Sequence, residues 1–141
     1  MLSRLLSRGV LAAQAPRGVR KADVLVNFLD GGKPALIQVK SRQSGSDGGW
    51  HMSEKHETQL EEDLWFCFVN FEPDSPTVHV IPAKVVATAL RIDHQTWLDT
   101  PGRNGQAHNS TNMRRLRPKM SSQPEGWIDW YLENWDQIIQ G

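Results

Sequence analysis

Three side chains in the first third of the chain, Asp23, Gln38 and Lys40, are of types that can carry out chemistry together. Carboxylate and amide oxygens can bind hard cations, and an ammonium group can stabilise negative charge that develops during a reaction. These capacities combine only if the three side chains meet at one place. The segments that carry them must therefore position them.

The stretch that holds all three predicts a β-hairpin. Residues 22–29 and 34–42 are rich in Val, Ile, Leu and Phe, and the Asp30-Gly31-Gly32-Lys33 sequence between them is typical of a tight turn. Side chains alternate across a strand, so Gln38 and Lys40 share one face of the second strand.

Two registers of this hairpin remain open. A two-residue loop at Gly31-Gly32 sets Asp23 opposite Lys40, and a loop at Asp30-Gly31 sets Asp23 opposite Gln38. Both registers place Asp23 on the face that Gln38 and Lys40 share, whereas a slip of one residue would turn one strand over. The sequence therefore predicts that a carboxylate, an amide and an ammonium group lie within cross-strand contact distance.

The hairpin resembles the core of the PD-(D/E)XK nuclease superfamily. Asp23, then fourteen residues, then Gln38-Val39-Lys40 after an apolar pair matches the branch that carries Gln in place of the second acid. The resemblance extends from about Val10 to His108. It implies an α/β fold with an αβββαβ restriction-endonuclease-like core, in which helices flank a central mixed sheet, followed here by a C-terminal helix.

The same resemblance implies roles for the three residues. Asp23 and Gln38 would hold a divalent metal, Mg²⁺ or Mn²⁺, and Lys40 would be the catalytic lysine beside them. A bound metal can activate water and stabilise charge on a phosphodiester, and magnesium needs only one or two carboxylates. Gln38 offers a neutral oxygen, which should weaken the metal relative to a second acid.

One ligand of the family pattern is not found. The family often places an acid on its first helix, but no acid precedes Asp23. Either the chain begins partway through that helix or the ligand is absent.

Basic residues are clustered in parts of the chain, although the formal net charge of the whole chain is zero. Local potential rather than net charge acts on phosphates, so a groove can be basic in a neutral protein. The loop from Pro101 to Asn112 and the basic run after it are candidates to contact nucleic acid, with DNA as the expected partner; a solvated loop is an equal alternative. The candidate residues are Arg42, Arg103, Arg114, Arg115, Arg117 and Lys119.

The chain length of 141 residues predicts one domain, 1–141. The single cysteine, Cys67, cannot form an internal disulfide, which favours a reducing, cytoplasmic compartment. No stretch approaches the roughly twenty apolar residues of a membrane span.

The segment before the hairpin has two interpretations. Residues 1–21 fit a partial first helix, ending at Gly9, and a first strand over Val10–Ala13. Their Arg-rich, acid-free composition is also that of a mitochondrial transit peptide.

Later elements follow from apolar periodicity. Ser53 predicts the N-cap of a helix to about Asp63, residues 64–71 predict a strand covered on both faces, and residues 77–81 predict another strand. Pro82 begins a helix that packs on the sheet. Residues 94–100 either extend it or form a second helix.

The C-terminal segment 121–141 predicts an amphipathic helix. Trp127, Trp130, Tyr131, Trp135 and Ile138 recur at steps of three and four residues. This aromatic stripe packs within the chain or against a second copy as a homodimer.

Three functions follow as hypotheses. The first is a metal-dependent DNA endonuclease. The second is a nucleic-acid-binding module on the same fold without catalysis, which the Gln at position 38 and the missing acid favour. The third is a small oligomeric adaptor that uses the tryptophan-rich segment.

Overall fold

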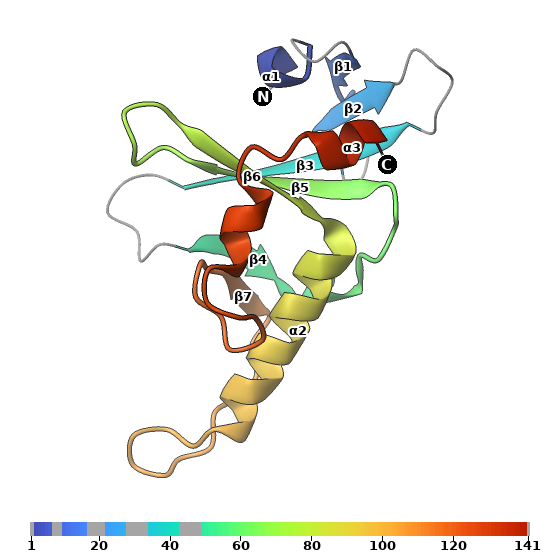
Figure 1. Ribbon diagram of the computed structural model, residues 1–141. Helices are drawn as coiled ribbons and strands as arrows, with labels where there is room; N and C mark the ends of the chain where they lie inside the picture. Colours follow the sequence, from blue (N-terminus) through green and yellow to red (C-terminus); the bar gives the residue numbers. More distant parts are fainter. Residues whose placement is uncertain (1, 7–9, 17–21, 28–33, 43–48, 141) are drawn as a thin grey trace.

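A mixed sheet of five strands is the centre of the part of the chain that the structure describes (Figure 1). The computed structural model describes residues 2–6, 10–16, 22–27, 34–42 and 49–140. The sheet contains β1 (Leu11–Gln14), β2 (Val24–Asn27), β3 (Ala35–Arg42), β5 (Leu64–Asn70) and β6 (Thr77–Pro82). A separate ribbon contains β4 (Trp50–Ser53) and β7 (Met113–Leu116). The helical elements are α1 (Leu2–Leu6), η1 (Glu54–Thr58), α2 (Ala83–Asp99), η2 (Trp127–Tyr131) and α3 (Asp136–Gln140).

The strands of the sheet lie in the order β1-β2-β3-β5-β6. All neighbours are antiparallel except β3 and β5, which run parallel. Parallel neighbours need a connection that leaves the sheet and returns. In this chain the described part of that connection forms β4 and η1.

Strand β5 lies inside the sheet because its sequence is apolar on both faces. Phe66, Cys67 and Phe68 are all fully buried. A strand with one face in solvent would alternate between polar and apolar residues. The predicted strand over residues 64–71, covered on both sides, is confirmed.

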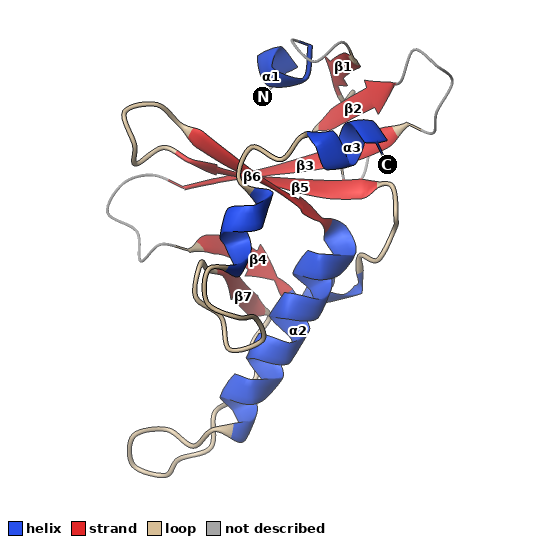
Figure 2. Ribbon diagram, viewed as in Figure 1, coloured by secondary structure: helices blue, strands red, loops and turns tan. Residues whose placement is uncertain are grey.

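Alternation along the strands divides the core into two clusters, one on each face. On one face Phe66 and Phe68 pack against α2 and the β4–β7 ribbon. On the other face Ile37 and Cys67 pack with residues of α1 and α3. Helices therefore flank the sheet on both sides (Figure 2), and the predicted fold class is confirmed.

Helix α2 begins directly after Pro82, as predicted, and continues without interruption to Asp99. Residues 94–99 therefore extend this helix and do not form a second one. Its buried residues Val86, Ala89 and Leu90 recur at helical spacing and face the sheet.

The predicted N-cap at Ser53 is confirmed, but the predicted extent of the helix to about Asp63 is wrong. Trp50 and Met52 are buried while His51 between them is exposed, which is the period of a strand, and they form β4. After Ser53 the chain makes only the short 3₁₀ helix η1. Strand β4 is stabilised by β7, some sixty residues later in the chain, and no local signal reveals such a partner.

The predicted C-terminal helix over residues 121–141 is divided into η2 and α3. Between them Glu133 adopts a positive φ of 48°, its N–H donates to the carbonyl of Val78 (2.7 Å), and its carboxylate accepts from the N–H of Val78 (2.7 Å). The chain therefore crosses the edge of β6. It delivers Trp127 to one face of the sheet and Trp135 to the other.

This arrangement gives the tryptophans of the segment different roles. Trp135 is 0% exposed and Trp130 is 70% exposed. We expect Trp135→Ala to lower the free energy of unfolding by about 3–5 kcal/mol, because it leaves a large cavity. Trp130→Ala should change it by less than about 0.5 kcal/mol. Urea denaturation of both variants measures the difference, and equal losses would contradict the division of the segment.

Candidate active site

The register of β2 on β3 places Asp23 beside Gln38. Val24 pairs with Ile37 and Leu25 with Leu36, so one step further along the ladder Asp23 lies opposite Gln38. Of the two registers left open by the sequence, this is the one with Asp23 opposite Gln38. The turn residues 28–33 lie outside the described part of the chain.

The Asp23 carboxylate is held against the backbone of β3. Its Oδ2 atom accepts a hydrogen bond from the N–H of Val39 (2.7 Å), and the N–H of Asp23 donates to the carbonyl of Ile37 (2.7 Å). Val39 separates Gln38 from Lys40 in the sequence, so the carboxylate lies at the backbone between the two side chains. Asp23 is exposed, which leaves this position open to solvent.

Lys40 lies in an electrostatic environment that disfavours its charge. Burial and the positive charge of Lys55 lower the pKa of Lys40 below its ordinary value, and the Asp23 carboxylate partly offsets this effect. Lys55 belongs to η1, so the 3₁₀ helix contributes a second cation next to the hairpin. The charge of the Lys40 ammonium is therefore disfavoured by one neighbouring cation and favoured by one neighbouring acid.

Gln38 has an oxygen without a partner. Its Oε1 atom is buried and accepts no hydrogen bond. A buried carbonyl without a partner is uncommon in folded proteins, and each case requires an explanation. Both lone pairs of this oxygen are available to a new partner.

His56 is a further member of the site. It is 1% exposed, and its ring meets Phe66 edge-on with the ring centroids 5.6 Å apart. Burial and the positive charges of Lys40 and Lys55 lower the pKa of His56 to about 4. His56 is not among the candidate site residues that the sequence predicts, because residues 53–63 were expected to form a longer helix. Its position follows from the short 3₁₀ helix η1 that forms there instead.

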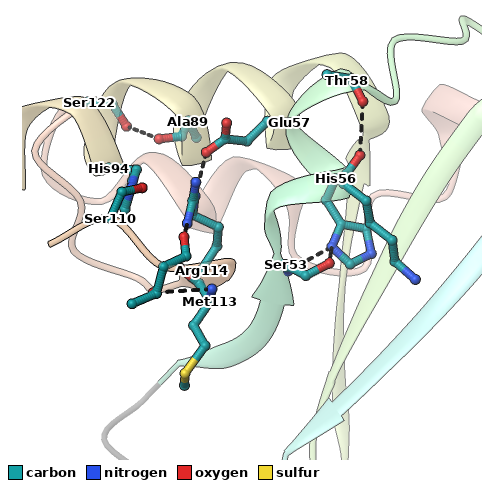
Figure 3. A network of polar contacts seen from close by, with 12 residues as sticks. Ser53, His56, Glu57, Thr58, Ala89, His94, Ser110, Met113, Arg114 and Ser122 are labelled. Carbon is teal, nitrogen blue, oxygen red and sulfur yellow. Dashed lines mark hydrogen bonds and ion pairs between the residues drawn. The ribbon is translucent and has the colours of Figure 1, made fainter.

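Glu57, the next residue, turns to the opposite side of η1 and forms an ion pair with Arg114 (Figure 3). Arg114 is 7% exposed and also donates to the carbonyls of Thr111 and Met113. It was expected to contact nucleic acid. In the structure it instead fastens β7 to η1, and its guanidinium is not free for a phosphate.

The other candidate nucleic-acid contacts lie on different elements, and two of them pair with acids or rings within the chain. Arg42 stacks over the ring of Trp50 (4.3 Å) and lies 4.0 Å from the carboxylate of Glu72. Arg117 pairs with Asp93 (3.0 Å). Arg103 and Lys119 are exposed, and Arg115 is partly buried.

A pocket of about 310 Å³ lies between α2 and the chain around β7. Three of the predicted arginines, Arg114, Arg115 and Arg117, line it together with Trp97. The ring of His108 stacks on Trp97 with the centroids 4.0 Å apart, and His94 stacks on it at 5.6 Å. These contacts hold the predicted loop after α2 against the helix.

The site is sparse in acidic ligands. Among the described residues, no group of three or more His, Cys, Asp or Glu side chains is placed to hold a metal ion. Within the described part of the hairpin, Asp23 supplies a carboxylate and Gln38 an amide oxygen without a partner. Cys67 belongs to the core, where burial raises the pKa of its thiol.

Comparison with solved structures shows the same fold in a nuclease. The chain superimposes on a bacterial homing endonuclease, I-Ssp6803I, with a TM-score of 0.52 and 18% identity. The match covers 98% of this chain and 82% of the other. No family model and no curated protein matches the sequence. The likeness shows the nuclease-like fold that the hairpin motif predicts.

The helices in the described part of the chain are too short or too polar for any of them to pass through a lipid bilayer.

Burial of His56 should appear as a pH dependence of stability. The imidazole has a pKa of about 4 in the folded protein and an ordinary value of 6.5 in the unfolded chain. As pH falls from 6.5 towards 4 the unfolded state takes up the proton first, so the free energy of unfolding decreases across this window. Above pH 6.5 the contribution is fully present.

We expect His56→Asn to remove this part of the acid dependence, on the order of 1–3 kcal/mol between pH 6.5 and pH 4. Urea unfolding of both proteins at several pH values measures it. His79, whose pKa burial also lowers, is present in both and cancels in the comparison. Parallel pH curves for the two proteins would show that His56 is not buried as a neutral group.

Proposed function

We propose that this protein is a metal-dependent endonuclease of the PD-(D/E)XK type that hydrolyses phosphodiester bonds in DNA. The observation that supports it is the hydrogen bond from the Val39 N–H to the Asp23 carboxylate. It fixes the acid at the backbone between Gln38 and Lys40, in the order and spacing of the superfamily motif. The fold shared with a homing endonuclease is the context that makes DNA the expected substrate.

The donor set at the hairpin fits magnesium or manganese better than a softer metal. Asp23 supplies a charged oxygen, and Gln38 supplies a neutral oxygen whose lone pairs are unused. Magnesium keeps several waters and needs few protein ligands. Such an ion would supply an activated water and charge stabilisation on the phosphoryl oxygens.

The protein's own groups have distinct tasks in this proposal. Asp23, which is exposed, faces the incoming phosphate and holds the ion against the end of β2. Lys40 stabilises the negative charge that develops on the phosphate oxygens. Lys55 adds a second positive charge beside Lys40, which attracts an anionic backbone to this face of the sheet.

Loss of Lys40 should abolish cleavage and leave the fold intact. We expect Lys40→Ala to reduce plasmid nicking in Mg²⁺ or Mn²⁺ by about 100-fold or more, which is the usual cost of removing one charge-stabilising group. The circular dichroism spectrum should be unchanged. Lys84→Ala is the matched control, because it removes one positive charge from an exposed position of α2. Undiminished cleavage by Lys40→Ala would refute the assignment.

A binding module without catalysis is the second candidate. The observation that favours it is that Asp23 is the one carboxylate held at the backbone between Gln38 and Lys40 among the residues described, so its metal affinity would be low. A calorimetric titration with Mn²⁺ separates the two candidates. No metal heat, together with DNA binding that weakens steeply with salt, would favour the module.

Homodimerisation through the C-terminal segment remains a proposal with a narrower basis. Trp127 and Trp135 pack inside the chain, so Trp130 and Leu132 are the exposed large side chains of this segment. A dimer would have to use these two residues rather than the whole aromatic stripe.

A further inference from the structure

Two side chains that each carry a buried polar atom without a hydrogen bond are neighbours of Phe66. The two atoms are Oε1 of Gln38 and Nε2 of His56. Gln38 pairs in register with Phe66 across β3 and β5, and the ring of His56 packs edge-on against Phe66. The two atoms therefore belong to one compartment, between the sheet and η1.

The proton on His56 can be assigned from its other nitrogen. The backbone N–H of Ser53 donates to Nδ1 of His56 (2.9 Å), so Nδ1 is the acceptor and carries no proton (Figure 3). In a neutral imidazole the proton is then on Nε2. The two partnerless atoms are thus a donor and an acceptor, which complement each other.

The same assignment disfavours His56 as a metal ligand. Ligation through Nε2 would move the proton to Nδ1, where it would face the N–H of Ser53. Two donors would then oppose each other in a buried position, at a cost of about 1–3 kcal/mol for the unsatisfied group. In the neutral form that the Ser53 hydrogen bond favours, Nε2 of His56 is a donor and has no lone pair to offer a metal.

We propose that His56 is a positioning residue that donates its Nε2–H to Oε1 of Gln38, directly or through one water, and orients this oxygen towards the bound ion. One lone pair of Oε1 accepts from His56 and the other remains for the metal. This inference rests on the proposed function, because it gives His56 a role in the same metal site.

The surroundings of His56 suit this task. Its charged form is disfavoured by burial and by Lys40 and Lys55, so the imidazole stays neutral across the working pH range. Groups that orient a metal ligand through a hydrogen bond typically change metal affinity about 10–100-fold when they are removed. Gln38 is a neutral side chain in the second position of the motif and attracts a metal less than an acid would. A hydrogen bond that orients its oxygen therefore matters more than it would for a carboxylate.

Two substitutions separate the role of each ring nitrogen. His56→Asn keeps an oxygen near the position of Nδ1, so it can still accept from Ser53, but it removes the Nε2–H donor. His56→Gln places an amide N–H₂ near the position of Nε2 and restores the donor. We expect His56→Asn to weaken Mn²⁺ binding at least about ten-fold in a calorimetric titration, and His56→Gln to bind within about three-fold of the natural protein.

A measurement without metal accompanies the titration. In the metal-free protein, a long-range ¹H–¹⁵N spectrum should show His56 with its proton on Nε2 from about pH 5 to pH 8. Urea unfolding of both variants without metal verifies that each is folded at the temperature of the titration.

The outcomes distinguish this inference from the function it rests on. Mn²⁺ binding by the natural protein that His56→Asn leaves unchanged would overturn the positioning role and keep the metal site. Equal weakening in both folded variants, or a proton on Nδ1, would also overturn it. No Mn²⁺ binding by the natural protein would overturn the metal site itself.

Discussion

The site depends on one constraint, which is that β3 lies inside the sheet with a neighbour on each side. It pairs antiparallel with β2 and parallel with β5, so its side chains can only alternate between the two faces. Ile37 enters one core, whereas Gln38 and Lys40 turn to the face that carries η1. Any rotation of this strand would bury the polar side chains and expose the apolar ones, so the fold itself fixes which side the chemistry is on.

The carboxylate is added to this strand by the end of β2. The ladder between β2 and β3 stops at the pair of Val24 and Ile37, and beyond this pair the N–H of Val39 donates to the side chain of Asp23 instead of a carbonyl. A backbone donor that the sheet leaves unpaired thus becomes the anchor of an acid. The need of the Val39 N–H for an acceptor therefore both ends the ladder and positions the carboxylate of the site.

The parts of the fold that were predictable from the sequence are those in which neighbours along the chain decide the structure. The hairpin strands, the apolar β5 and the helix after Pro82 carry their own periodicity. Asp23, Gln38 and Lys40 were selected because they are on one such hairpin. The turn sequence left two registers open, and the structure shows the one with Asp23 opposite Gln38.

What could not be predicted depends on partners far along the chain. Strand β4 exists because β7 pairs with it, and the position of His56 follows from that ribbon. The sequence predicts Arg114 as a surface cation, but in the structure it forms an ion pair with Glu57, which is distant in the sequence. The regular spacing of Trp127 and Trp135 suggested one helix, but a helix cannot serve both faces of a sheet, and a turn at Glu133 lets the segment do so.

The segment that passes over the edge of β6 has a consequence for how the two cores are completed. Residues near 127 complete one face of the core and residues near 138 complete the other, and Arg4 of α1 joins Glu133 between them (2.9 Å). Without this segment, both faces of the sheet would expose apolar side chains that it covers. The two cores therefore cannot be completed independently of each other, because one segment closes both.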